Sequence, residues 1–197
     1  MITRRSRGRE VALQVLYQVE QNPEIHYKQP RLLYWNVGGG KFKDVSAESG
    51  PGLTEPWSSR GSAAGDLDND GSLEVVINNM GARPSLLKNF GPRKNWLLVR
   101  LVGVKCNRDA IGARAVVTVG GRRVSAEVQS GTSYVSSNDP RLHFGLADDA
   151  AYDRVEVTWP GGEREVFAGG AANRIVELMQ GTGVPAGAAV PPRGAGH

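Results

Sequence analysis

Seven short apolar segments follow one another between residues 95 and 180, with turns between them and no helical periodicity. In residues 153–159, DRVEVTW, the side chains of Val155, Val157 and Trp159 fall on one face of an extended chain, and the polar side chains fall on the other. This period of two is typical of a half-buried strand. Closely spaced strands without helices between them predict an all-β domain, either an antiparallel sandwich or a small barrel.

Glycine-rich turns support the same interpretation. Gly120 and Gly121 separate two strand patterns and predict a two-residue hairpin, and residues 160–162 (PGG) predict a slightly longer one. Residues 24–92 are expected to form further short strands separated by turns. From residue 181 to residue 197 the sequence is rich in Gly, Ala and Pro, which predicts a disordered tail.

The N-terminal segment has a different pattern. Apolar residues recur between residues 8 and 21 at the spacing i, i+3, i+4 and i+7, which predicts a short amphipathic α-helix. At about 14 residues such a helix is marginal alone in water and needs a surface to pack on. The apolar positions are Ala12, Val15, Leu16 and Val19.

The net charge of +4 is small for a chain of 197 residues. Outside the first 21 residues the charges are nearly balanced, so the sequence does not predict a broad surface for a polyanion. Weak nucleic-acid binding is expected only through four N-terminal arginines. Neither a secretory signal nor an apolar run long enough for a membrane span is recognisable, so the compartment stays open. The four arginines are Arg4, Arg5, Arg7 and Arg9.

Residues 66–74, DLDNDGSLE, carry the sharpest chemical signal in the sequence. Three aspartates alternate, a glycine then permits a tight turn, and a glutamate stands at position nine. Ca²⁺ prefers about six to eight oxygen ligands, and alternating aspartates on a turning loop can point inward together. The sequence therefore predicts a Ca²⁺ site. The expected ligands are Asp66, Asp68, Asp70, Ser72 through its backbone carbonyl, and Glu74.

The loop does not fit an EF-hand. That motif requires glutamate at position twelve, where this chain has Ile77, and predicted strands rather than helices flank the loop. The alternative to a cation site is a solvated turn rich in Asp, Asn and Gly.

Two longer stretches resemble known families. Residues 30–52 and 60–89, PRLLYWNVGGGKFKDVSAESGPG and RGSAAGDLDNDGSLEVVINNMGARPSLLKN, resemble the FG-GAP/VCBS repeat of β-propellers. The motifs IGARAVVTVGG, SSNDPRLHFGL and VTWPGG resemble the ASPIC/UnbV domain, which closes bacterial FG-GAP proteins and the animal cartilage acidic proteins. Together the two resemblances cover about residues 23–180.

The resemblance implies a domain order and a set of metal ligands. It places a partial propeller blade with its calcium loop at residues 23–94 and an ASPIC/UnbV domain at residues 95–180. It makes Asp66, Asp68, Asp70 and Glu74 the calcium ligands, although loops of this kind more often have aspartate where Glu74 stands. Relatives are usually exported, and no catalytic residue comes with the resemblance. One blade is too little for a closed propeller, so the chain is expected to be a fragment of a larger protein that self-associates through exposed strand edges.

Residues 1–22 lie outside that likeness. Their basic start, RRSRGREVALQVLYQVEQ, resembles the N-terminus of the NusB family of antitermination factors. This resemblance implies an RNA-binding factor as an alternative function, but the helical periodicity that a helical bundle needs does not continue past residue 24.

The sequence therefore favours a non-enzymatic, calcium-binding β module that binds or adheres to an unknown protein or glycan. His143 stands alone in a strand pattern and is expected to be a structural hydrogen-bonding residue. A carbohydrate-binding accessory module is a further alternative, since four tryptophans could line a glycan surface.

Overall fold

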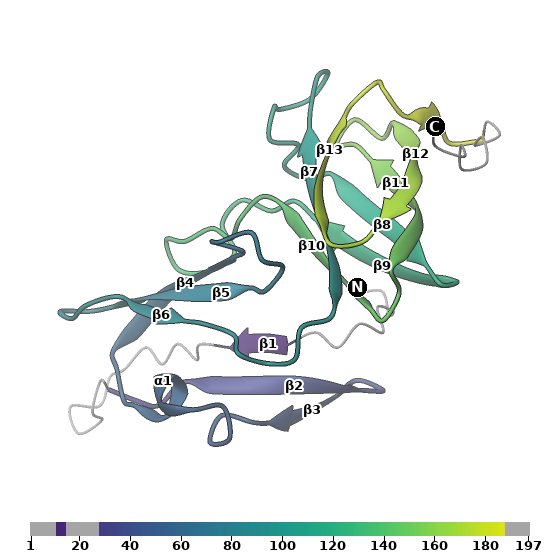
Figure 1. Cartoon of the computed structure of the whole chain (residues 1–197). Coiled ribbons are helices and arrows are strands. Elements are labelled where there is room, and N and C mark those ends of the chain that lie inside the picture. Colours follow the sequence, from purple (N-terminus) through teal and green to yellow (C-terminus); the bar gives the residue numbers. More distant parts are fainter. Residues whose placement is uncertain (1–10, 15–27, 188–197) are drawn as a thin grey trace.

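The computed structural model describes residues 11–14 and 28–187, and the regular secondary structure in this part of the chain is almost entirely β (Figure 1). The predicted all-β fold class is confirmed. Four sheets are present in the described residues, and none of them closes into a barrel. Within the same residues, no helix has the length and apolar character needed to cross a membrane.

The N-terminal part consists of two three-stranded antiparallel sheets. A single helical turn, α1 (Pro51–Thr54), connects them in sequence. The first sheet has the order β1 (Val11–Gln14), β2 (Leu32–Gly38) and β3 (Lys41–Asp44), and the second has the order β4 (Ser59–Gly65), β5 (Glu74–Asn79) and β6 (Ser85–Leu87).

A buried arginine links this first part of the chain together. Arg31 is only 3% exposed and precedes β2. Its guanidinium donates to the side-chain oxygen of Asn79 at 3.0 Å, to the hydroxyl of Ser85 at 2.8 Å and to the carbonyl of Gly52 at 2.5 Å. These bonds connect the start of β2 with α1, β5 and β6, so the second sheet is anchored to the chain that forms the first.

The C-terminal part is a two-sheet sandwich (Figure 1). Its smaller sheet has the order β10 (Leu142–Ala147), β7 (Asn95–Val102) and β13 (Arg174–Met179). Its larger sheet has the order β14 (Val184–Pro185), β12 (Arg164–Ala171), β11 (Ala151–Thr158), β8 (Arg114–Val119) and β9 (Arg122–Glu127).

The core of the sandwich confirms the predicted alternation. Val155, Val157 and Trp159 are buried, and they pack in one cluster with Leu97 of β7 and Phe144 of β10. The polar residues between them on β11 stay partly exposed. Both facing sheets therefore supply alternate residues to one apolar core.

The predicted hairpin turns are also present. Gly120 and Gly121 join β8 to β9, and both have positive φ angles, of 51° and 73°. Positive φ at both central residues is what a type I′ turn requires, and glycine accepts it without steric cost. Residues 160–162 make the turn between β11 and β12, which the Trp159 N–H closes on the Glu163 carbonyl at 2.9 Å.

One strand pairing differs from an antiparallel sandwich. β13 pairs with β7 in parallel, with Arg174 opposite Leu97 and Met179 opposite Val102. Parallel neighbours need a long connection, and here the strands of the other sheet and β10 supply it. The first and last long strands of the sandwich therefore lie side by side.

The predicted N-terminal helix is wrong at the residues that the structure describes. Val11–Gln14 form strand β1, which pairs antiparallel with β2, while the rest of the predicted helix, residues 8–10 and 15–21, lies outside the described residues. The edge of β2 offers unpaired backbone groups, whereas a short isolated helix has a costly nucleus. Pairing with the sheet edge therefore outweighs the helical pattern.

The predicted disordered tail is corrected over residues 181–187. Val184–Pro185 form β14 at the edge of the larger sheet. The carboxylate of Glu165 accepts hydrogen bonds from the N–H groups of Gly181 at 2.8 Å and Gly183 at 3.0 Å, which fixes the chain ahead of β14. Composition alone does not reveal such an anchor. Residues 188–197 of the predicted tail lie outside the described part of the chain.

Candidate metal centre

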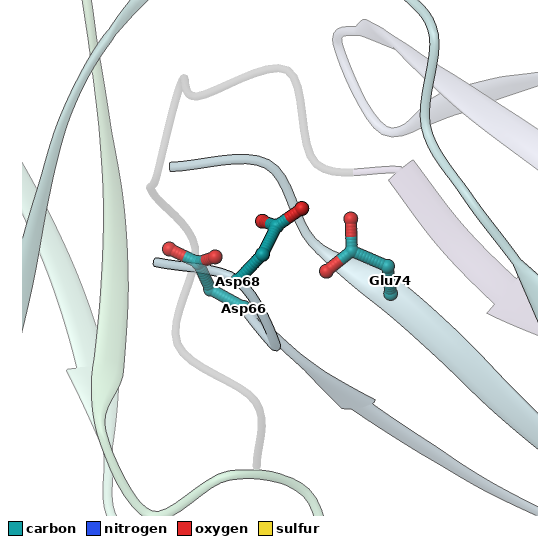
Figure 2. Close-up of side chains that lie close together, drawn as sticks. All are labelled: Asp66, Asp68 and Glu74. Carbon is teal, nitrogen blue, oxygen red and sulfur yellow. The ribbon is translucent and has the colours of Figure 1, made fainter. Parts of the chain in front are cut away.

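The acidic loop forms the end of a β-hairpin. β4 and β5 pair antiparallel with Gly65 opposite Glu74, so residues 66–73 connect the two strands. Figure 2 shows the side chains of Asp66, Asp68 and Glu74 gathered at this loop. Each offers a carboxylate oxygen within 4.8 Å of the others. The structure thus brings together three of the five predicted ligands.

Two of these carboxylates are buried and shape the loop. Asp66 is 1% exposed, and its two oxygens accept the backbone N–H groups of Asp70 at 3.0 Å and Gly71 at 2.9 Å. Glu74 is 3% exposed, and its Oε2 accepts the N–H of Leu67 at 3.0 Å. These bonds curl the backbone around the carboxylates, because each N–H satisfied by a side chain no longer needs a sheet partner.

The second oxygen of Glu74 has a different environment. Oε1 is buried and has no hydrogen-bond partner among the described residues. A buried carboxylate oxygen without a partner carries an uncompensated desolvation penalty. A cation bound between Glu74, Asp66 and Asp68 removes that penalty.

Asp70 and Ser72 lie at the loop but outside this cluster. Oδ1 of Asp70 accepts the N–H of Ser72 at 2.8 Å, and its Oδ2 pairs with the guanidinium of Arg93 at 2.6 Å. The hydrogen bond from the Ser72 backbone lowers the pKa of Asp70, and the charges of Arg93 and Lys88 lower it further. The structure therefore assigns Asp70 an arginine partner, and the carbonyl of Ser72 remains only a predicted ligand.

A lysine reaches the cluster from β6's C-terminal end. Nζ of Lys88 lies 2.6 Å from Oδ2 of Asp68. The hydrogen bond to Asp68 raises the pKa of Lys88, and the charges of Asp68, Glu74 and Asp70 act in the same direction. The loop thus holds a tethered ammonium group beside the carboxylates that would receive a metal ion.

Sequence reasoning missed four side chains that, among the described residues, form hydrogen bonds or ion pairs with the loop. Lys88 and Arg93 follow β6, while Arg141 and His143 come from the second part of the chain, more than 70 residues from the loop atoms they contact. Arg141 and His143 do stand inside the motif SSNDPRLHFGL, but nothing in local spacing connects that motif with an acidic loop. His143 is a hydrogen-bonding residue here, since its Nε2 lies 2.8 Å from the carbonyl oxygen of Gly71.

Comparison with protein families gives two separate matches in the chain. Residues 27–77, which include the acidic loop, match the FG-GAP-like repeat. Residues 103–185, which include most of the sandwich, match the family described as ASPIC and UnbV.

Similarity to whole proteins points in the same direction. The chain is 31% identical over 129 residues to cartilage acidic protein 1 of Homo sapiens, and 30% identical over 127 residues to cartilage acidic protein 1 of Xenopus tropicalis. These alignments cover 60% of this chain and 19% of each relative, so the chain spans about a fifth of the length of the curated relatives it matches. The chain therefore matches an FG-GAP-like repeat at residues 27–77 and an ASPIC/UnbV domain at residues 103–185, and part of it is similar to the cartilage acidic proteins.

Proposed function

We propose that the FG-GAP-like repeat binds one Ca²⁺ ion through Asp66, Asp68 and Glu74, and that the chain serves as a non-enzymatic binding module outside the cell. The observation that carries the proposal is the buried, unpartnered Oε1 of Glu74 beside two further carboxylates. An acidic cluster alone is common on protein surfaces. A carboxylate that is more than nine-tenths buried and has an unsatisfied oxygen is uncommon, because its desolvation on folding is not offset by a hydrogen bond.

The donor set favours calcium over other ions. All candidate ligands are oxygens, which excludes a preference for soft metals. The loop backbone and water can supply the remaining ligands of a flexible shell of about six to eight oxygens. Mg²⁺ demands a smaller octahedral cage and usually keeps several waters, whereas three clustered carboxylates on a hairpin loop suit the larger, more variable shell of Ca²⁺. FG-GAP repeats are often calcium-binding, which supports the same choice.

The setting outside the cell is supported by the relatives. The relatives are named for cartilage, a tissue dominated by extracellular matrix. Extracellular calcium modules bind with dissociation constants of about 10⁻⁴–10⁻³ M, which suits the calcium concentration there. The matched families are generally non-catalytic, and this supports a binding role toward a protein or glycan partner.

Glu74→Gln is expected to abolish the calcium response of the protein. With a dissociation constant near 10⁻⁴ M, about 1 mM Ca²⁺ stabilises the wild type by about 1.4 kcal/mol, or roughly 3–6 °C in melting temperature. Glutamine keeps the bond to the Leu67 N–H but removes the charged ligand. Melting curves of both proteins, with Ca²⁺ and with chelator, measure the difference.

Glu177→Gln is the matched control, because Glu177 is an exposed residue of β13 paired with Arg100, in the sandwich. This variant should keep the wild-type shift. A wild type that melts at the same temperature in calcium and in chelator would show that the loop is an acidic turn and contradict the proposal.

Lys88→Gln is expected to strengthen calcium binding. Nζ of Lys88 forms an ion pair with Oδ2 of Asp68 at 2.6 Å, and this pair must break before Asp68 can bind the metal ion. Exposed ion pairs of this kind are weak, so the dissociation constant should fall by about 2–5-fold. Calorimetric titration with Ca²⁺ measures the change, and Lys94→Gln is the control, since Lys94 forms a comparable exposed pair with Asp148. Equal affinities of Lys88→Gln and wild type would show that the lysine does not compete.

A further inference from the structure

The acidic loop is held by hydrogen bonds from the ASPIC/UnbV domain. Nη1 of Arg141 donates to the side-chain oxygen of Asn69 at 2.6 Å, and Nη2 donates to the backbone carbonyl of Asp66 at 2.8 Å. Arg141 directly precedes β10, so one guanidinium reaches from the sandwich to two points of the loop. The points lie on either side of Asp68, which is one of the three clustered carboxylates.

Asp139 fixes the arginine in this position. Its Oδ2 accepts from Nε of Arg141 at 2.7 Å, and its backbone N–H donates to the carbonyl of Ala64 on β4 at 2.9 Å. The hydrogen bond to Asp139 raises the pKa of Arg141. Burial acts to raise the pKa of Asp139, but the hydrogen bonds and charge of Arg141 outweigh it and lower that pKa. The two side chains therefore form a hydrogen-bonded ion pair, and Asp139 offsets the positive charge that would otherwise repel a cation.

The loop backbone that Arg141 contacts has an unusual conformation. Asn69 has a φ of 60°, in the left-handed region that costs most residues free energy. Arg141 bonds to the side chain of this residue, and His143 bonds to the carbonyl of Gly71 two positions later. Both contacts come from the ASPIC/UnbV domain, so that domain stabilises the turn which orients Asp66 and Asp68.

We propose that Arg141 is a positioning residue for the cation loop, so that the ASPIC/UnbV domain sets the calcium affinity of the FG-GAP-like repeat. This inference rests on the calcium binding proposed above. A loop held in its bound shape does not lose conformational entropy when the ion arrives, and its affinity rises accordingly. Without the guanidinium, the loop samples other shapes and only a fraction of molecules is competent to bind.

The coupling works in both directions. If the domain contact raises calcium affinity by some factor, then calcium strengthens the contact by the same factor. The ion would therefore hold the repeat and the ASPIC/UnbV domain in one arrangement, although all its side-chain ligands lie on the repeat.

Calorimetric Ca²⁺ titration of the whole chain tests the inference. Arg141→Gln should raise the dissociation constant about ten-fold, which is within the usual range of coupling between two sites. Arg141→Lys should raise the dissociation constant less, because an ammonium group can keep one of the two loop contacts but cannot make both at once as a guanidinium does. Arg154→Gln is the matched control, since Arg154 pairs with Glu156 within β11, and it should bind as the wild type does. Asp139→Asn, which leaves the arginine but removes its charged support, is expected to fall between Arg141→Gln and wild type.

Melting in chelator separates positioning from a merely structural role. A structural role lowers the melting temperature of Arg141→Gln in chelator but leaves the calcium dissociation constant unchanged, and this result would overturn the inference. If the wild type binds Ca²⁺ and both Arg141→Gln and Asp139→Asn bind it with the wild-type dissociation constant, the inference is wrong but the proposed function stands. A wild type without calcium binding removes the proposed function and the inference together.

Discussion

Gly71→Ala is expected to destabilise the protein by about 2–5 kcal/mol and to abolish its calcium response. Gly71 has a φ of 87°, where a side chain costs about 1–2 kcal/mol, and a Cβ built there overlaps the indole ring of Trp96. Overpacking of this kind costs about a further 1–3 kcal/mol. The loop must then move away from β7, which also removes the contact between Gly71 and His143. Chemical unfolding, with Ca²⁺ and with chelator, measures both effects.

Gly81→Ala is the matched control for this prediction. Gly81 also has a positive φ, of 66°, but no described heavy atom lies within 4 Å of a Cβ built there. The control should therefore lose only the conformational part, about 1–2 kcal/mol, and keep its calcium response. Equal losses in the two variants would show that the packing of Gly71 against Trp96 contributes nothing.

Phe144→Ala is expected to lower the free energy of unfolding of the sandwich by about 3–5 kcal/mol. Phe144 is 1% exposed and packs among residues of both sheets, so its removal leaves a cavity that close-packed neighbours fill only partly. For a domain of this size the melting temperature falls by about 4–8 °C for each kcal/mol lost. Thermal unfolding followed by near-ultraviolet circular dichroism measures the loss.

Phe90→Ala makes the same chemical change at the surface. Phe90 is 88% exposed in the segment between β6 and β7, so the free energy of unfolding should change by no more than about 0.5 kcal/mol. A loss from Phe144→Ala as small as that from Phe90→Ala would mean that β10 does not pack in the core of the sandwich.

Much of the sandwich could be predicted because its signals are local. The alternation of Val155, Val157 and Trp159 and the pair Gly120-Gly121 each depend on residues within one strand or turn. The errors came where a distant partner decides the structure. Val11–Gln14 follow the edge of β2 instead of their own helical pattern, and β7 pairs with β13 across more than 70 residues.

At the acidic loop, too, the features set by local spacing could be predicted and those set by distant partners could not. The alternating aspartates and Glu74 could be found from spacing, and the structure gathers three of them. The pairing of Asp70 with Arg93 could not, because a single sequence does not say which of many cations a carboxylate meets. The bonds from Arg141 to the loop depend on how two domains dock, and no local pattern encodes that arrangement.

The parallel pairing of β7 and β13 has a mechanical consequence. The chain enters the sandwich at the start of β7 and leaves the small sheet at the end of β13, and these two points lie at opposite ends of the paired strands. Tension pulling them apart therefore slides the strands along each other and loads the whole ladder, from Arg174 opposite Leu97 to Met179 opposite Val102, at once. Antiparallel neighbours joined by a hairpin would instead open one bond at a time. The parallel pairing therefore resists stretching along the direction of β7 and β13 better than a hairpin would.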